Sequence, residues 1–565
     1  MINNSSILKK ILQDSYLFCV VPECEVARIS NFKRVLKKIG IQYFEIPNIE
    51  MYSLLIFHSN FKDVYTHTRF INEQKDYNVE DLIDNNYHKT KIHSIDTLIS
   101  FSFTDFKIFY ACNDYLGIFR HYYTQLKEDS FIASNNSFLI AALIDSEVSS
   151  NSIYDTLFFR FPYKSGSYFD KVKSLSHNEV LEFDIINRVL NIDKINYPKS
   201  IKDYYSKSAS EGLEDFWQKI AINTKSRNIK VSFSGGSDSM TVVSILDKFK
   251  YNFDLLSFEG HNQKDTDRIV KLASSLNKNI DLIKTKENSS SEDDIFEYTV
   301  LSNGFIVSDH FYHFYKKCEW ETIFDGYSFV LGDWSDAFIS NIHKDVLLNK
   351  SSLKDLFQKY YYGFSNQFIV DMLEYIASNY EFPDGNSSKG LDYVQHYSID
   401  FICSRILAGV ILPANYFKVK NFSYFLSKKF FCPILNSNYG ISRTFSSRND
   451  YPGYIINRLP LAQIASGTKS KAFTKTMDNG ISLKDILYNN QLTKVKMLFY
   501  KKKKAIINKL FGDKNIKSQA IQNLDSFPSY VIDSINLNSY AKNQLKIIST
   551  VENSLNKLKK LVEIN

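Results

Sequence analysis

One short segment near the middle of the chain constrains the fold more than any other. Residues 229–233 are mainly apolar, residues 234–239 are small and polar and include Gly235 and Gly236, and residues 241–246 have the composition of a helix. This order predicts a strand, a turn and a helix. Glycines let backbone amides approach a ligand closely, and a helix directs its positive end at the same place. The segment therefore predicts an anion-binding turn that suits a pyrophosphate.

Asp238 indicates that a metal takes part in this site. A carboxylate repels phosphate oxygens unless a divalent cation lies between them, so we expect Mg²⁺ here. No Gly-Lys-Ser or Gly-Lys-Thr follows the glycines, which distinguishes the segment from the common P-loop. An ordinary Ser/Gly turn between a strand and a helix is the competing interpretation.

The length of 565 residues requires more than one domain. We expect a sheet-rich α+β domain over residues 1–196. Its predicted strands cover residues 17–21, 52–58, 98–103, 107–111 and 180–183. The polar segment 197–210 marks the boundary, and the second domain covers residues 211–565, starting with a predicted amphipathic helix over 211–224.

Strands and helices alternate in the second domain. The predicted strands cover residues 229–233, 253–258, 280–283 and 322–331, and a predicted helix covers 265–276. This alternation predicts an α/β fold with a parallel sheet, in which the glycine turn lies at the carboxyl end of the first strand, where such sheets bind ligands. After about residue 340 the pattern is mostly helical, and it ends in a Lys-rich amphipathic helix near 544–562.

Charge and cysteine content narrow the function classes. A net charge of +7 over this length does not indicate a nucleic-acid partner. The Lys-rich run over 494–504 favours a solvated helix face, with a partner or membrane-surface patch as the alternative. The 6 cysteines have no metal-ligand spacing, and no segment has the length of a membrane span, so we expect a cytoplasmic protein without membrane insertion.

A second acidic segment follows the predicted strand 322–331. Residues 331–338 read Leu-Gly-Asp-Trp-Ser-Asp-Ala-Phe, which places Asp333 and Asp336 three positions apart. On a tight turn or a first helical turn, both carboxylates can face one cation. Taken alone, the pattern also fits ordinary helix capping.

Together the two segments resemble the asparagine synthetase family. Residues 234–239 match Ser-Gly-Gly-x-Asp-Ser, the signature of the PP-loop ATP pyrophosphatase superfamily, whose synthetase domain has the adenine nucleotide alpha hydrolase-like fold. Residues 332–338 are similar to the family's Ser-Gly-Glu-Gly-Ser-Asp-Glu-Leu-Phe. The resemblance implies that Asp238 and Asp336 ligate Mg²⁺ and that Asp333 occupies the position of a catalytic glutamate, with Trp334 where the family has glycine.

The resemblance also implies which residues contact ATP and which cation assists the chemistry. The ATP-binding positions would be Phe233, Ser234, Gly235, Gly236, Ser237, Asp238, Ser239, Ser257, Phe258, Leu331 and Gly332. The family places a catalytic lysine where this chain has Arg448, and Lys469 or Lys471 are alternatives for that role. A surface role for these three cations is the competing interpretation.

The N-terminal half resembles the Ntn-type glutaminase domain of the same family. Residues 112–123 are similar to Asp-Arg-Leu-Gly-Ile-Arg-Pro-Leu-Tyr-Tyr, and residues 131–143 to the Phe-Ala-Ser-Glu helix entry. The glutaminase uses an N-terminal cysteine, whereas this chain begins Met-Ile-Asn-Asn-Ser and its first cysteine, Cys19, lies in a predicted strand. We therefore expect a degenerate glutaminase domain, as in β-lactam synthetase, carbapenam synthetase and lasso-peptide cyclases, with Ser5 or Ser6 as an alternative nucleophile.

The sequence thus predicts an ATP-dependent, AMP-forming carbon–nitrogen ligase. It would adenylate a small-molecule or peptide carboxylate, release pyrophosphate, and transfer the acyl group to an amine or ammonia, as in peptide macrocyclisation, lactam formation or amidation of a small acid. The sequence also allows a homodimer. The alternatives are a PP-loop tRNA-modifying enzyme and a non-catalytic binding protein of the same fold. The sequence does not identify the substrate.

Overall fold

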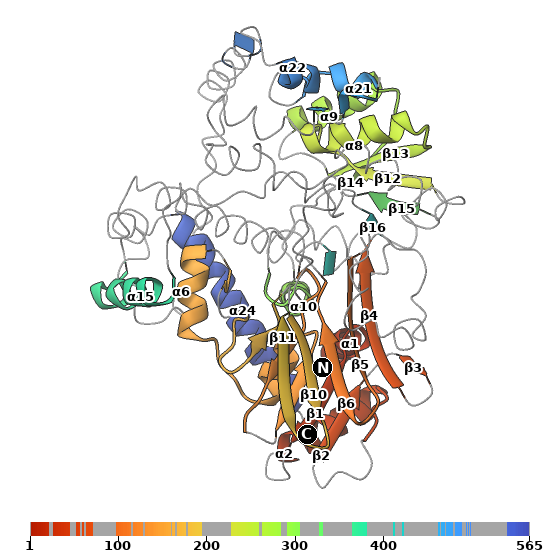
Figure 1. The fold of residues 1–565 in the computed structure, drawn as a ribbon. Coiled ribbons are helices and arrows are strands. Elements are labelled where there is room, and N and C mark those ends of the chain that lie inside the picture. Colours follow the sequence, from red (N-terminus) through yellow and green to blue (C-terminus); the bar gives the residue numbers. More distant parts are fainter. Residues whose placement is uncertain are drawn as a thin grey trace.

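The computed structural model describes much of the first half of the chain and several segments of the second. It covers residues 2–21, 26–45, 52–56, 59–61, 64–71, 98–114, 117–127, 130–159, 161–163, 166–176, 179–194, 228–258, 263–283, 291–305, 327–330, 364–380, 411–412, 421–422, 462–463, 465–468, 470–477, 481–488, 493, 495–496, 498 and 539–563. Within these residues the fold is mixed α/β, with two antiparallel sheets and one parallel sheet (Figure 1).

The first antiparallel sheet has the strand order β2-β1-β8-β7-β9. Its strands are β1 (Leu17–Val21), β2 (Tyr52–Ile56), β7 (Tyr122–Thr124), β8 (Phe131–Ser134) and β9 (Lys173–Ser174). Successive side chains of a strand point to opposite faces. Accordingly, Leu17, Cys19 and Val21 join a core shared with helices, whereas Phe18 and Val20 join a core shared with the second sheet. Both faces of β1 are covered, which explains its unbroken apolar run.

The second antiparallel sheet has the order β11-β10-β6-β5-β4-β3. Its strands are β3 (Ser59–Phe61), β4 (Val64–Ile71), β5 (Leu98–Thr104), β6 (Ile108–Cys112), β10 (Glu179–Asp184) and β11 (Val189–Lys194). Aromatic rings join the two sheets: Phe18 stacks on Phe109 at 4.6 Å and Phe131 stacks on Phe183 at 4.4 Å between centroids. Phenylalanine side chains thus fill the space between the two sheets of the sandwich.

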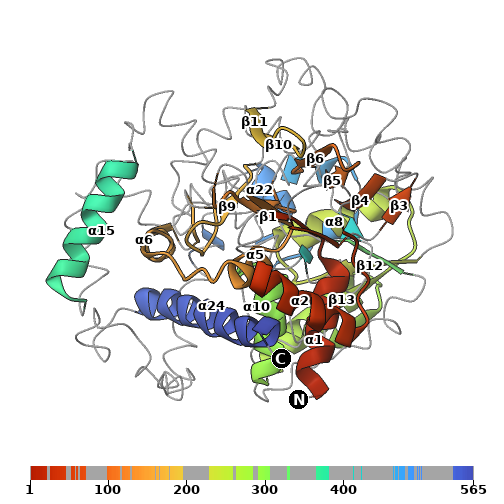
Figure 2. The ribbon, with the colours of Figure 1, turned by 90° about the horizontal axis from the view of Figure 1, so that it is seen from below.

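A layer of helices covers the outer face of the first sheet. It contains α1 (Ile2–Asp14), α2 (Val26–Ile39), α5 (Ser137–Leu143), α10 (Glu292–Leu301) and α24 (Ser539–Glu563). Two of these helices, α10 and α24, come from far along the chain, and Figure 2 shows both beside α1 and α2. The sandwich is therefore completed by segments that follow residue 211 in sequence.

The helix α24 is bound through both apolar and charged contacts. Val551, Leu555 and Leu558 repeat at helical spacing and are buried in the same core as Leu17 of β1. On the flanks of this stripe, Lys559 pairs with Asp145 at 2.8 Å, and Lys557 pairs with Asp293. The predicted C-terminal amphipathic helix is confirmed, although nothing in its pattern identified the first sheet as its partner.

Two asparagines connect α10 to α5. Asn136 caps α5 and donates through Nδ2 to the carbonyl of Val300 at 3.0 Å. In return, Asn303 Oδ1 accepts from the backbone amide of Ser137 at 2.8 Å. These bonds are buried, so they satisfy polar groups that would otherwise destabilise the helix contact.

The parallel sheet has the order β14-β13-β12-β15-β16. Its strands are β12 (Asn228–Ser232), β13 (Phe253–Phe258), β14 (Ile280–Ile283), β15 (Tyr327–Val330) and β16 (Asn421–Phe422), and each neighbouring pair is parallel. The chain moves outward from β12 to β14 and then returns to the other side of β12 for β15. The predicted parallel sheet is confirmed, and β12 is its topological switch strand.

Helices pack near this sheet and along the sandwich. They are α6 (Ser150–Phe159), α8 (Ser237–Lys248), α9 (Gln263–Ser275), α15 (Asn366–Asn379), α21 (Lys471–Thr474) and α22 (Leu483–Tyr488). The predicted helix over 211–224 and the predicted boundary over 197–210 lie outside the described residues. In the described part of the chain, no helix is both long enough and apolar enough to span a bilayer.

Candidate functional site

The turn between β12 and α8 requires glycine at Gly235. This residue has φ of +74°, a region that side chains with a Cβ rarely occupy. A Cβ at this position would also lie 3.0 Å from Cδ2 of Leu272 on α9. Gly235 therefore lets the turn lie close to α9, and it has no side chain that would cover the backbone of the turn.

The helix α8 begins earlier than the sequence predicts. Its first residue is Ser237, so Asp238 and Ser239 lie in the first helical turn and not in the preceding loop. The N-cap residue is Gly236, with φ −81° and ψ 174°, and the helix has no side-chain cap. Glycine has no side-chain oxygen that could accept a hydrogen bond from the first amides of α8. The positive end of the helix therefore faces the β12–α8 turn without a capping side chain from Gly236.

Hydroxyl groups surround this helix end. Ser234 Oγ accepts from the amide of Gly236 at 3.3 Å, and Ser239 Oγ donates to the Gly236 carbonyl at 3.1 Å. The two hydroxyls are 3.5 Å apart. Ser234 is exposed, whereas Ser237 and Ser239 are each 4% exposed. The turn thus combines backbone and hydroxyl donors at one place on the surface.

Asp238 is the carboxylate of this turn. It lies in the first turn of α8, where the helix dipole favours a negative charge, and its Oδ1 atom is buried. A carboxylate oxygen beside backbone and hydroxyl donors is the type of ligand that a divalent cation binds. The described residues therefore suit both a polyphosphate and a hard metal ion.

Neighbouring strands end at the same edge as the turn. Phe233 continues from β12 and donates its amide to the carbonyl of Leu256 at 2.8 Å. Ser257 and Phe258 close β13 on one side, and Val330 closes β15 on the other, opposite Val231 in register. The turn therefore lies at the switch point of the sheet, the place where open α/β sheets bind ligands.

Several predicted site residues lie outside the described part of the chain. They are Leu331, Gly332, Asp333, Asp336, Arg448 and Lys469. Lys471 is described: it is exposed and opens α21, whose N-cap Ser470 donates through Oγ to Asp247 Oδ2 at 2.6 Å. Asp247 and Asp238 lie at opposite ends of α8, about 13 Å apart along its axis. Lys471 therefore begins a helix that is anchored at the end of α8 away from the turn.

The two described thiols of the N-terminal half are buried. Cys19 lies in β1 as predicted, and burial raises the pKa of its thiol far above the usual value. Burial and the charge of Asp114 raise the pKa of Cys112 in the same direction. A thiol held protonated in a core is a poor nucleophile. Ser5 and Ser6, the alternative nucleophiles, are exposed within α1.

A buried histidine network in the sandwich was not predicted from the sequence. His121 is 2% exposed; its Nε2 lies 2.8 Å from Ser100 Oγ and 3.1 Å from the Cys112 carbonyl, and its Nδ1 lies 2.8 Å from Tyr16 Oη. A carbonyl only accepts, so Nε2 carries a proton and donates to the Cys112 carbonyl. Ser100 donates to the carbonyl of Phe119 at 2.8 Å. His121 is therefore not a base for Ser100, and the network is structural.

Comparison with known proteins adds no relative to this description. The sequence matches no protein-family model, and no similar sequence is found among curated proteins.

Proposed function

We propose that this protein is an ATP-dependent ligase that joins a carboxylate to an amine or ammonia and forms AMP and pyrophosphate. The observation that supports it best is the β12–α8 turn. There, a glycine with positive φ, an N-cap without a side chain and two serine hydroxyls lie at the switch point of a parallel sheet. This arrangement supplies donors for a polyphosphate without steric obstruction.

The residues of the sequence motifs have distinct roles in this proposal. The turn over residues 234–239 binds the β and γ phosphates of ATP through amides and hydroxyls. Phe233, Ser257 and Phe258, together with Leu331 and Gly332, line the nucleoside side at the strand ends. Asp238 is one Mg²⁺ ligand and Asp336 is the second. When bound, Mg²⁺ would neutralise phosphate charge and make pyrophosphate a better leaving group.

The reaction then proceeds in two displacements. A carboxylate oxygen of the substrate attacks the α-phosphorus of ATP, the bond between the α and β phosphates breaks, and pyrophosphate leaves. An amine attacks the acyl carbon of the adenylate, AMP leaves with the acyl–oxygen electron pair, and the amine loses a proton. Asp333 accepts that proton, and Arg448 or Lys469 balances the negative charge that develops on the oxygens.

The N-terminal half has a supporting role without glutamine hydrolysis. We propose that residues 1–196 form a degenerate glutaminase-like sandwich and residues 211–565 the PP-loop synthetase domain, with α10 and α24 binding the sandwich. The buried, protonated Cys19 supports this proposal, because the family's nucleophile must be an accessible thiolate. The nitrogen then comes from a substrate amine or free ammonia.

Nucleotide binding is the first test, because it needs no knowledge of the acceptor. Saturating MgATP at about 100 times its Kd stabilises a protein by about 2.7 kcal/mol, so the melting temperature of the full-length protein should rise. Asp238→Asn should abolish the rise. Asp254→Asn, which removes a carboxylate from β13 away from the turn, is the matched control and should keep it. The proposal fails if MgATP does not stabilise the unaltered protein.

Product analysis is the second test. With mixed carboxylate and amine substrates, the unaltered protein should release pyrophosphate and AMP in equal amounts. Formation of ADP and phosphate would contradict the proposal. Tight tRNA binding with a steep salt dependence would favour the tRNA-modifying alternative, and MgATP binding without turnover would favour the non-catalytic one.

A further inference from the structure

A pocket lies between α6 and α15. Both ribbon views show these two helices well away from α8 (Figures 1 and 2). It has a volume of about 270 Å³. Its lining combines polar, aliphatic and aromatic side chains and consists of Ser150, Ile153, Tyr154, Ser365, Gln367, Phe368 and Asp371. This size suits a small organic molecule and is separate from the proposed nucleotide site.

The two helices that form the pocket carry negative charge only. Lys and Arg make up 69 of the 565 residues, yet neither α6 nor α15 contains one. Their charged residues are Asp155, Asp371 and Glu374. Among the described residues that line the pocket, Asp371 is the charged one, on a protein with a net positive charge.

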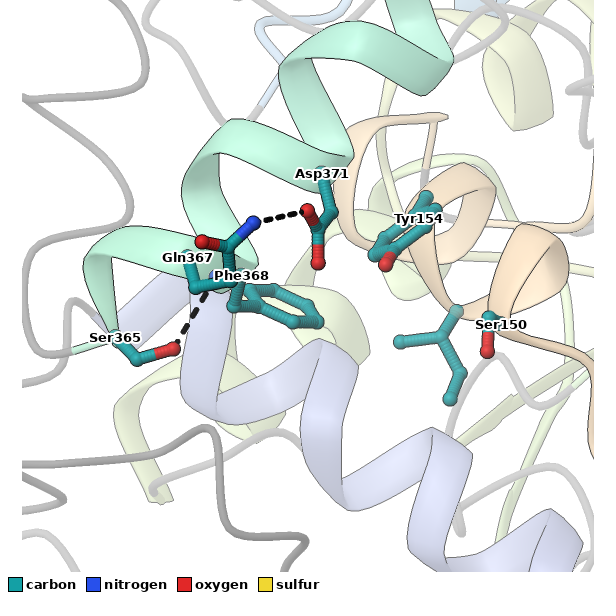
Figure 3. Close-up of a pocket in the computed structure, with 7 residues that line it drawn as sticks. Ser150, Tyr154, Ser365, Gln367, Phe368 and Asp371 are labelled. Atoms are coloured by element: carbon teal, nitrogen blue, oxygen red, sulfur yellow. Dashed lines mark hydrogen bonds between the residues drawn. The ribbon is translucent and has the colours of Figure 1, made fainter.

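Asp371 has one carboxylate oxygen that faces the pocket region without a described partner. Gln367 donates through Nε2 to Asp371 Oδ1 at 2.7 Å, and Oδ2 makes no hydrogen bond to any residue that the structure describes. Burial and the charge of Asp371 raise the pKa of Tyr154, which indicates a negative potential at this ring. Figure 3 shows the Asp371 carboxylate and Tyr154 on facing sides of the pocket, with the Phe368 ring below them.

Packing and hydrogen bonds fix the aromatic side chains of the pocket, Tyr154 and Phe368, which form its aromatic wall. The rings of Tyr154 and Phe368 lie 5.4 Å apart, and Tyr154 also packs on Tyr375 at 5.4 Å. Tyr375 and Tyr380 both donate to the buried Asp155 at 3.1 and 2.6 Å. A wall fixed by buried hydrogen bonds loses little entropy when a ligand binds.

We propose that this pocket binds a small organic ammonium ion. The ammonium group donates to Asp371 beside the face of Tyr154, and the alkyl chain packs on Phe368 and Ile153. A carboxylate next to aromatic rings is the chemistry that recognises such cations. The inference does not depend on the ligase proposal.

The N-terminal ends of the two helices predict a ligand of the opposite charge, so the experiment also includes an anion. The N-termini of α6 and α15 both reach the pocket and would favour an anion. However, the effect is confined to the first turn, and Ser365 Oγ already accepts the amide of Phe368 at 3.2 Å. Asp371 carries a full charge in the second turn of α15, so we expect the cation to be preferred.

The experiment compares n-butylammonium with n-butyrate on the full-length protein by saturation-transfer NMR and calorimetry. Butylammonium should bind with a Kd of about 1 mM, which is within the range open to so small a ligand, and butyrate should not bind. Asp371→Asn keeps the size of the side chain and should weaken butylammonium binding by about tenfold or more. Glu374→Gln removes the same charge from α15 outside the pocket lining and should change the Kd by less than about twofold.

A second variant guards against misfolding. Tyr154→Leu keeps Asp371 and removes the aromatic face, so it should weaken butylammonium binding by about threefold to fivefold while the protein still unfolds in one cooperative thermal transition. The inference is overturned by any of three results: no saturable butylammonium binding, stronger binding of butyrate, or equal binding by the unaltered protein and Asp371→Asn.

Discussion

The sandwich and the β12–α8 turn differ in the partners that their polar groups have. In the sandwich, His121, Ser100 and Tyr16 are buried and bond to one another or to nearby carbonyls. In the turn, an N-cap glycine without a side chain leaves the helix end facing the edge of the sheet. A polar group satisfied inside the protein stabilises the fold, whereas one directed at a strand edge is available to a ligand. The contrast favours the turn over the histidine network as the candidate ligand site.

The largest effect should come from the core that joins the sandwich to α24. Leu558 is fully buried there, so Leu558→Ala should cost about 3 kcal/mol of stability through lost burial and a cavity. Faster hydrogen exchange at the β1 amides would show that the loss reaches the first sheet. The exposed Asn556→Ala on the same helix is the control. Unchanged exchange in β1 would mean that α24 does not stabilise the sandwich.

The histidine network should come next. His121→Leu fills similar space but leaves Tyr16 Oη and the Cys112 carbonyl without their bonds to the ring, so we expect a loss of about 2 kcal/mol in the free energy of unfolding. Urea unfolding of the full chain measures it. MgATP binding should be unaffected, because the network is remote from the turn. A variant that kept its stability but lost nucleotide binding would reverse the contrast between the two regions.

Gly235→Ala should have an intermediate effect on stability, about 1–2 kcal/mol, because an alanine must adopt positive φ and contact Leu272. Under the proposed function it should also weaken MgATP binding. Gly236→Ala is a control for the loss of stability only, since its φ is negative and its new methyl group would meet only the Ser234 hydroxyl at 3.3 Å. Thermal unfolding with and without MgATP compares them. Equal effects of both changes would show that the backbone conformation of Gly235 is not required.

The smallest effect should be an acid-dependent one at the β10–β11 hairpin. The backbone and side-chain amides of Asn187 and the amide of Ile186 bond to Asp184 and lower the pKa of its carboxyl below the ordinary 3.8. A lowered folded-state pKa means that this stabilisation is present above about pH 4 and is lost as the pH falls through the folded pKa. Asp184→Asn should therefore lower the melting temperature slightly at pH 7 and less at pH 3. Equal shifts at both pH values would contradict this.

Much of the local structure was predictable from residue pattern. The strand starting near Ile229 and the glycine turn form where expected, and a helix follows them, because glycine, serine and apolar periodicity act over a few residues. The start of α8 was predicted too late, because Ser237 and Asp238 were assigned to the turn although both residue types are common at helix starts. The strand β16 has only two residues, which is too short to detect from the sequence.

The sequence by itself determined the strand–turn–helix around Gly235, the burial of Cys19 in a strand and the amphipathic character of the last helix. Only the tertiary structure decided that β12 is the switch strand, that α10 and α24 complete the core of the sandwich, and that Tyr154 and Asp371 line one pocket. The physical reason is that backbone preference and periodicity are local, whereas these pairings join segments far apart in the chain. Their stability depends on buried area and hydrogen bonds that exist only after the segments meet.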